Sequence, residues 1–226
     1  MILSPRRYQY ALVIPVINDG DRIRGQLRAI RDLGLAIDVI ITDGGSTDGS
    51  LDEAFIRTTG VNTLLVKKGP GRLSAQLRMA YAWALARGYE GIMTVDGNGK
   101  DSVDSVPLFT QALESGYDLI QGLRYVAGGI AENTPLDRLI AGKFVHAPLI
   151  SLGAGFRFTD TMNGFRGYSA RALRDPRVNP FREEFRDYNL LFYLSVRIPR
   201  LGYRPARCLS PGAIRRKGGH PPRSVA

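Results

Sequence analysis

The chain has 226 residues, of which 31 are lysine or arginine and 21 are acidic, giving a formal net charge of +10 at pH 7, and it has a single cysteine. One cysteine excludes an internal disulfide and a cysteine metal cluster, which favours a reducing compartment such as the cytoplasm. The net charge predicts attraction to anions, but it is spread along the chain without a nucleic-acid motif, so nucleic acid is not an expected partner. The longest uncharged apolar stretch, 144–156, is too short to span a bilayer.

The first part of the chain alternates between apolar runs and helical patterns. Strands are predicted at 10–16, 37–41, 63–66, 90–95 and 117–121, because buried parallel strands are short apolar runs. Helices are predicted between them at 22–33, at 48–57 with Asp48 as N-cap, at 71–86, and from Ser105 with Pro107 in the first turn. The alternation predicts an α/β fold with a Rossmann-like, mostly parallel open sheet and helices on both faces.

The regular alternation ends after Gly122. Helices are predicted at 134–150 and 183–196, with an irregular stretch around 160–166 between them. The predicted organisation is a single domain over 1–208, with a nucleotide-binding half at about 8–122 and an acceptor-side half at about 123–208. A basic, flexible tail is expected at 209–226, where glycine and proline accompany arginine and lysine.

Two short acidic segments each follow a predicted strand. Asp43 lies in the segment 41–49, and Asp96 lies in the segment 95–101. Ligands of open α/β sheets bind at the carboxyl ends of the strands, so these carboxylates could bind a nucleoside or hold a cation against a diphosphate. Aspartate and glycine also simply form turns, and either segment alone leaves both interpretations open. As a pair they favour a nucleotide site.

Several segments, taken in order, resemble the family 2 glycosyltransferases of GT-A fold, above all the dolichyl-phosphate mannose synthase and polyprenyl-phosphate glycosyltransferase branch. The resemblance covers about 8–205 and is carried by residues 15–19, 43–50, 95–98, 121–125 and 160–166. It implies an inverting transfer of a sugar from a nucleoside diphosphate sugar to polyprenyl phosphate or else to a saccharide hydroxyl. It also implies a cytoplasmic protein with peripheral contact to the inner face of the membrane.

The resemblance assigns the donor site to the loops after the strands. Asp43 matches the aspartate that accepts a hydrogen bond from the base. Asp96 matches the first acid of the metal-binding DxD signature, which holds Mg²⁺ or Mn²⁺ across the diphosphate. The loop that ends at Arg72 precedes a helix N-terminus and could bring basic charge to a phosphate. The loop after the first strand, which lies against the nucleoside, contributes Pro15, Asn18 and Asp19.

The metal signature departs from the family pattern. Its second acid is Asn98, and a further ligand position is occupied by Lys100, which cannot bind a cation while protonated. Metal affinity should therefore be reduced. In one hypothesis Asp96, Asn98 and Asp101 retain a weak divalent site. In another, the metal is dispensable because Lys100 supplies positive charge itself. A third interpretation leaves Lys100 facing solvent.

Candidate acceptor-side residues come from the second half. Arg124, Arg138 and Arg166 match positions that face anionic groups in related enzymes, although ordinary pairing with nearby acids is the alternative. Asp160 is the candidate base if the acceptor is a hydroxyl. An acceptor phosphate is already ionised, and Asp160 would then orient Arg166 or the sugar. Catalytic candidates are thus Asp160, Lys100 and Arg166. An alternative for the whole chain is a degenerate sugar-nucleotide-binding regulatory or partner protein without turnover.

Overall fold

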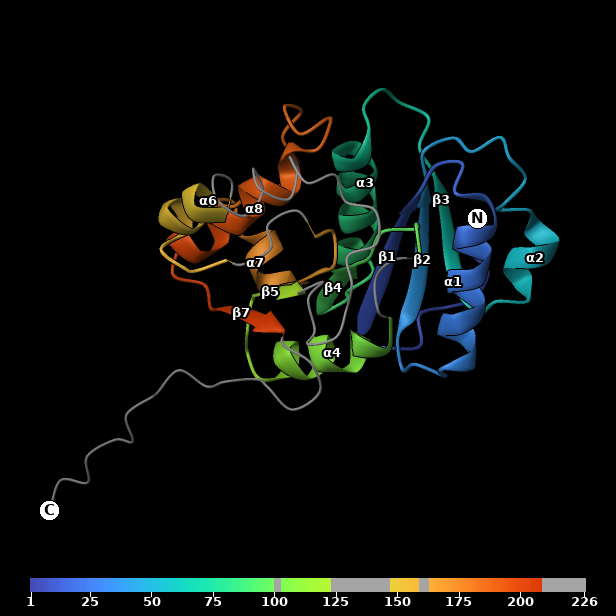
Figure 1. Ribbon diagram of the computed structural model, residues 1–226, viewed down its shortest axis with the longest axis horizontal. Helices are drawn as coiled ribbons and strands as arrows, with labels where there is room; N and C mark the ends of the chain where they lie inside the picture. The colour runs from blue at the N-terminus through green and yellow to red at the C-terminus, as the bar shows by residue number, and fades with distance from the viewer. Residues whose placement is uncertain (100–102, 123–146, 159–162, 209–226) are drawn as a thin grey trace, which may run out of the picture.

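The computed structural model describes residues 1–99, 103–122, 147–158 and 163–208. Their centre is a seven-stranded sheet with the strand order β3-β2-β1-β4-β6-β5-β7 (Figure 1). The expected α/β fold with a mostly parallel sheet and helices on both faces is confirmed.

The N-terminal half forms the parallel part of the sheet. Its strands, β1 to β4, pair in parallel, and every residue of β1 is buried, which explains its unbroken apolar run. The predicted strands and helices are confirmed here, but α2 starts later than expected. Its N-cap is Asp52, which accepts a 2.8 Å hydrogen bond from the Phe55 amide, because the Asp48 carboxylate is engaged by Ser50 instead. The elements are β1 (Tyr10–Val16), α1 (Gly20–Asp32), β2 (Asp38–Asp43), α2 (Glu53–Arg57), β3 (Val61–Val66), α3 (Leu73–Ala86) and β4 (Gly91–Thr94).

The C-terminal half adds a strand of opposite direction. β6 runs antiparallel to both β4 and β5, whereas β7 is parallel to β5. Neither β6 nor β7 was predicted as a strand, and α8 starts at Asn189 rather than at 183. The predicted helix at 134–150 lies mostly outside the described residues. The elements are a 3₁₀ turn (Val103–Ser105), α4 (Val106–Glu114), β5 (Leu119–Gly122), α6 (Ala147–Ala154), β6 (Arg166–Ser169), α7 (Ala170–Arg174), α8 (Asn189–Arg200) and β7 (Pro205–Cys208).

Each face of the sheet carries its own hydrophobic core. Leu12 and Ile14 of β1 join the core that α1, α2 and α4 cover. Ala11 and Val13 alternate with them and join the opposite core, which α3, α7 and α8 cover. In Figure 1 the two groups of helices lie on either side of the strands. Because the strands pack into a core on each face of the sheet, the positions of their ends are fixed.

The topology gathers distant loops at one edge. Val16, at the end of β1, is paired with Asp43, at the end of β2, and β4 ends beside them. Because β6 is antiparallel, it starts at this edge, where Arg166 pairs with Thr94. The segment 163–165 therefore arrives next to the loop that carries Asp96.

Candidate active site

The loops after β1 and β2 are tied together by hydrogen bonds. The Asn18 amide donates to Ser46 Oγ at 3.0 Å, and the Thr47 amide donates to Asn18 Oδ1 at 2.8 Å. The Gly20 amide donates to Asp48 Oδ2 at 2.9 Å, and hydrogen bonds, above all from Ser50, hold the pKa of Asp48 below its ordinary value. Asn18 adopts a left-handed conformation with φ of 52°, a region that asparagine tolerates well. The two loops thus form one wall of the site.

Asp43 organises the loop that follows it. Its carboxylate is buried, and Oδ1 accepts from the Gly45 amide at 3.1 Å and from the Ser46 amide and hydroxyl at 2.8 and 2.7 Å. All its described hydrogen bonds use Oδ1. Oδ1 of Asp43 therefore accepts the hydrogen bonds of the loop, and these bonds fix the orientation of Oδ2.

Asp96 lies against the segment that precedes β6. A methyl group on Gly164 would overlap the Asp96 carboxylate. A methyl group on Gly97 would lie 3.0 Å from the Pro15 carbonyl oxygen and 3.2 Å from Asp19 Oδ2. The backbone can approach these carboxylates so closely only because both positions are glycine. The structure therefore brings together Asp96, Asp19 and Pro15, three of the residues assigned to the donor site in the sequence analysis.

Two buried glutamines support these loops, and sequence analysis missed both. Gln76 Nε2 donates to the carbonyl oxygens of Val16 and Thr42 at 3.0 and 2.9 Å, which joins the ends of β1 and β2. Gln26 Nε2 donates to the Asp96 carbonyl oxygen at 3.1 Å. The sequence did contain a signal for Gln26. This uncharged polar residue lies between Ile23 and Leu27, on the buried face of the amphipathic helix α1.

The described residues offer oxygen donors that fit a hard divalent cation. They contain no group of three or more His, Cys, Asp or Glu side chains that could hold a metal ion. Asp96 and Asn98 are both partly exposed and supply a carboxylate and an amide oxygen. Mg²⁺ is commonly held by one or two carboxylates together with the substrate's phosphates. The glycine-lined surface of Asp96 therefore suits a cation shared with a diphosphate. Asp101 lies outside the described residues.

The N-terminus of α3 is closed by the chain itself. The Arg72 and Ser74 amides donate to the carbonyl oxygens of Arg186 and Asp187, both at 2.7 Å. The Arg72 guanidinium is exposed and lies 3.9 Å from the Asp187 carboxylate. These two amides are therefore not available to a phosphate, whereas the exposed Arg72 side chain is. The covering segment also explains why α8 starts later than predicted.

Arg166 lies inside the core, in contrast to the catalytic position expected for it. It is fully buried, and its Nη1 donates to the Leu191 carbonyl oxygen and to Ser195 Oγ, both at 2.5 Å. Its Nε donates to the Asn163 carbonyl oxygen at 3.1 Å. These contacts join α8 to the segment 163–165, which lies against Asp96. Arg166 is thus placed to position this segment.

The other predicted site residues are Lys100, Arg124, Arg138 and Asp160, all outside the described residues.

Comparisons with known proteins identify relatives of this chain. No protein-family model matches the chain. The chain is 30% identical over 196 residues to the undecaprenyl-phosphate mannosyltransferase of Micrococcus luteus, covering 85% of this chain and 78% of that protein. It is 25% identical over 166 residues to the polyprenol monophosphomannose synthase of Mycolicibacterium smegmatis, covering 72% of this chain and 62% of the relative.

The fold is that of a solved GT-A enzyme. Glucosyl-3-phosphoglycerate synthase of Mycobacterium tuberculosis, crystallised with Mn²⁺, UDP and phosphoglyceric acid, superimposes with a TM-score of 0.63 at 19% identity. The match covers 88% of this chain and 67% of that one. The sequence relatives of this chain act on polyprenyl phosphates, its fold is that of a GT-A enzyme, and its strand-end carboxylates include the glycine-lined Asp96. The chain therefore belongs to the polyprenyl-phosphate glycosyltransferase branch of the GT-A enzymes.

Proposed function

We propose that the protein transfers a sugar, with inversion, from a nucleoside diphosphate sugar to polyprenyl phosphate, or else to a saccharide hydroxyl. The observation that carries the proposal is the convergence of Pro15, Asp19 and Asp96 around Gly97 and Gly164 at one edge of the sheet. The names of the relatives, an undecaprenyl-phosphate mannosyltransferase and a polyprenol monophosphomannose synthase, support the acceptor class.

The donor would lie across the loops after β1, β2 and β4. Pro15, Asn18 and Asp19 would contact the nucleoside, and the second oxygen of Asp43 would accept from its base. This role is supported by the hydrogen bonds that fix Asp43 through Oδ1, because a preorganised acceptor loses little entropy on binding. Arg72 would approach the diphosphate from the exposed loop before α3.

Asp96 and Asn98, with Asp101, would hold Mg²⁺ or Mn²⁺ against the diphosphate. The bound cation would neutralise the charge that develops on the leaving nucleoside diphosphate. Related structures crystallised with Mn²⁺ and UDP support this assignment. A lysine at position 100 would share this task, which would make the metal less important than in relatives with a second acid.

The acceptor phosphate would need charge neutralisation but no general base. Its oxygen would attack the anomeric carbon from the face opposite the diphosphate, forming one C–O bond while the bond to the leaving group breaks. Arg124 and Arg138 would bind the acceptor phosphate. Asp160 would act as base only if the acceptor were a hydroxyl. Arg166, through its contacts with Asn163 and α8, would position the segment beside Asp96.

The protein would work as one domain over 1–208, with the tail 209–226 beside it, at the cytoplasmic face of the membrane. Within the described ranges, no helix has the length and apolar character needed to cross a bilayer.

The test is a transfer assay with purified protein, a panel of UDP-, GDP- and dTDP-sugars, and undecaprenyl phosphate dispersed in detergent. Mass spectrometry should detect a sugar-phosphate lipid with one donor. Asp96→Asn should lower the rate by about 100-fold or more, the usual scale for losing a charge-stabilising group. The exposed control Asp32→Asn should retain it. Transfer that survives thorough chelation would contradict the metal's role, and an unchanged rate in Lys100→Ala would contradict the role of Lys100.

A catalytically degenerate sugar-nucleotide-binding protein is the second candidate. It is favoured by Asn98, which replaces the second acid of the metal signature, and by the small set of acidic donors among the described residues. Thermal stabilisation by a nucleotide sugar, without transfer to any acceptor in the same panel, would establish it.

A further inference from the structure

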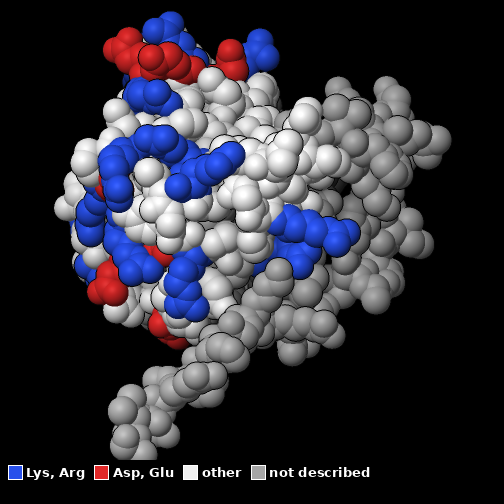
Figure 2. Space-filling model, turned by 90° about the vertical axis from the view of Figure 1, so that its left-hand side faces the viewer, with Lys and Arg blue, Asp and Glu red and all other residues white. Residues whose placement is uncertain are grey.

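Arginines gather on the face of the molecule formed by α7, α8 and β7. Figure 2 shows this face, where blue side chains spread over much of the described surface. We call it the arginine face. It comprises Arg171, Arg174, Arg177, Arg197, Arg200, Arg204 and Arg207.

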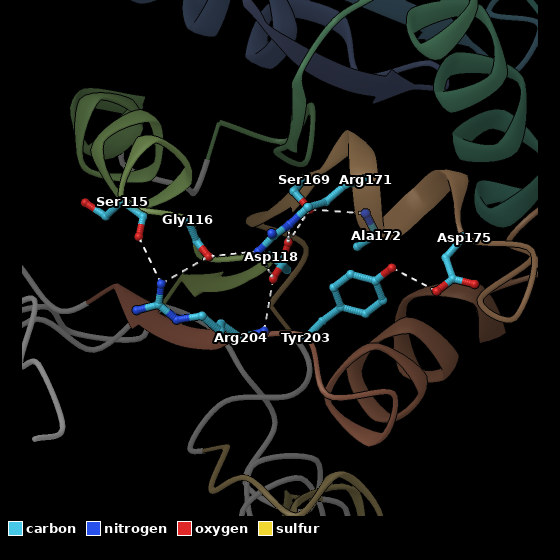
Figure 3. Close-up of polar contacts among 9 residues, drawn as sticks. All are labelled: Ser115, Gly116, Asp118, Ser169, Arg171, Ala172, Asp175, Tyr203 and Arg204. Carbon is cyan, nitrogen blue, oxygen red and sulfur yellow. Dashed lines mark hydrogen bonds and ion pairs between the residues drawn. The ribbon is translucent and has the colours of Figure 1, made fainter. Parts of the chain in front are cut away.

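Two acids of this face are already paired within it. Asp118 is buried, and its carboxylate accepts from Arg171 Nε and Nη2 at 2.6 and 2.8 Å and from Ser169 Oγ at 2.6 Å (Figure 3). Asp175 lies 2.7 Å from Arg177 Nη2, which holds the pKa of Asp175 well below its ordinary value. These two acids can neutralise only a minority of the arginines.

Several other arginines of the face are held by neutral partners. Arg174 Nη2 donates to the Leu85 carbonyl oxygen at 2.9 Å, and Arg197 Nε donates to the Arg177 carbonyl oxygen at 2.8 Å. Arg204 Nη1 donates to the Ser115 carbonyl oxygen at 3.2 Å, and Arg200 Nε donates to that of Gly153 (Arg204 in Figure 3). A carbonyl orients a guanidinium without cancelling its charge. Most N–H donors of each guanidinium remain for a further acceptor such as phosphate.

Exposed leucines lie next to these charges on α6. Leu149 and Leu152 are 63% and 78% exposed, and their spacing puts them on the same side of the helix. α6 packs on α8, and its Gly153 carbonyl is the acceptor for Arg200. A surface that combines arginine with exposed leucine suits a bilayer interface, where apolar side chains enter the boundary of the acyl chains and cations meet lipid phosphates. A nucleic acid would leave the leucines without apolar contacts.

We propose that the arginine face, with Leu149 and Leu152, is the surface through which the protein docks on an anionic bilayer. The inference deepens the proposed function, because polyprenyl phosphate resides in a bilayer, but docking itself requires neither donor nor acceptor. The occupant is the phosphate of anionic lipid headgroups, not a second protein.

The experiment measures co-sedimentation of the full chain with phosphatidylcholine vesicles that contain increasing shares of phosphatidylglycerol. The variant Arg174→Gln/Arg197→Gln/Arg200→Gln should bind anionic vesicles about 100-fold more weakly, because each basic residue near the surface strengthens the attraction roughly fivefold. The control Arg28→Gln/Arg31→Gln/Arg57→Gln removes the same charge from α1 and α2 and should bind like the parent. Leu149→Ser/Leu152→Ser should lose the part of the binding that persists at high salt.

Distinct outcomes would overturn the proposal. Parent-like binding by the first triple variant would assign docking elsewhere, and equal loss in both triple variants would show attraction by net charge alone. Tighter binding of the parent to duplex DNA than to anionic vesicles at the same salt would make the face a nucleic-acid surface. Melting curves of each variant test whether it is folded. If the first triple variant is destabilised, the leucine variant provides the test instead. Parent-like binding of the leucine variant at high salt would then contradict the proposal.

Failure of this inference is separable from failure of the proposed function. With acceptor dispersed in detergent, the triple variant should transfer sugar at the parental rate. Vesicle binding without any transfer would leave docking intact and remove only the proposed reaction. Transfer without vesicle binding would support the proposed reaction and contradict the docking proposal.

Discussion

The Asp96 carboxylate lies directly against the backbone of Gly164, so that any side chain at position 164 would occupy the space of the carboxylate. This contact joins a donor-side loop to the segment that opens β6. The Gly164 carbonyl oxygen is itself held by Thr94 Oγ1 at 2.9 Å, and Asn163 Nδ2 donates to the Gly122 carbonyl oxygen at 3.1 Å. The orientation of Asp96 is therefore set by residues from both halves of the chain.

Gly164→Ala should displace the Asp96 carboxylate and weaken cation binding. Disturbing a group that orients a metal ligand typically costs 10- to 100-fold in metal affinity, and we expect about that loss. Electron paramagnetic resonance titration of Mn²⁺ in the presence of nucleotide measures it independently of turnover. Gly25→Ala, where an added methyl group meets no neighbouring atom within 4 Å, is the control. Equal Mn²⁺ affinity in parent and Gly164→Ala would refute the positioning role.

Asn98→Asp should strengthen the same cation site. The substitution supplies the second carboxylate of the family signature, and a negatively charged oxygen binds a hard cation better than an amide oxygen does. The Mn²⁺ concentration that half-saturates the nucleotide complex should fall by about tenfold, on the scale of an added charged ligand. An unchanged value would mean that position 98 does not contact the cation.

Gln76→Ala should loosen the edge of the sheet that carries the donor loops. The side-chain amide donates to two buried carbonyl oxygens, those of Val16 and Thr42, and losing two such hydrogen bonds should lower the unfolding free energy by about 1–3 kcal/mol. Urea denaturation measures the loss. The exposed Gln111→Ala on α4 should stay within about 0.5 kcal/mol of the parent, as most surface substitutions do. Equal stability of the two variants would count against this support.

The sequence allowed prediction of the parallel half of the fold because its strands are unbroken apolar runs between amphipathic helices. β1 is buried throughout, and α1 places Ile23, Leu27 and Ile30 at helical spacing. β6 and β7 have no such pattern, since Arg-Gly-Tyr-Ser and Pro-Ala-Arg-Cys are neither alternating nor continuously apolar. Only tertiary pairing with β4 and β5 makes them strands.

The site was predictable where chemistry depends on strand ends, and less so where it depends on packing. The convergence of Asp19 and Asp96 follows from parallel topology. The burial of Arg166 does not, because a motif shows which residue is present but not which side of a strand it faces. Its acceptors, Leu191 and Ser195, lie on a helix distant in the sequence.

Asp175→Asn should reduce stability only where the native carboxyl is ionised. Arg177 and Tyr203 bind the carboxylate, so its folded-state pKa lies below the ordinary value of 3.8. A carboxyl whose pKa is lowered by folding stabilises the native state at pH values above its unfolded-state pKa. This contribution is lost as the pH falls through the folded-state pKa. The difference in Tm between parent and variant should therefore be constant near neutral pH and shrink below about pH 4. A difference independent of pH down to strong acid would contradict it. Added salt should also reduce the difference, though only in part, because the Arg177 side chain is 62% exposed whereas the Asp175 side chain is 8% exposed.

Arg166→Ala should affect stability before it affects chemistry. The substitution removes a fully buried side chain and leaves the carbonyl oxygens of Asn163 and Leu191 without this donor, which should lower the unfolding free energy by about 3 kcal/mol or more. Thermal melting and transfer should be measured together, with the exposed Arg157→Ala as control. If Arg166 only positions the segment beside Asp96, the loss of rate should be accompanied by lower Mn²⁺ affinity and a lower Tm. A large fall in the rate constant with parental Tm and parental Mn²⁺ affinity would instead show that Arg166 reaches the reacting groups.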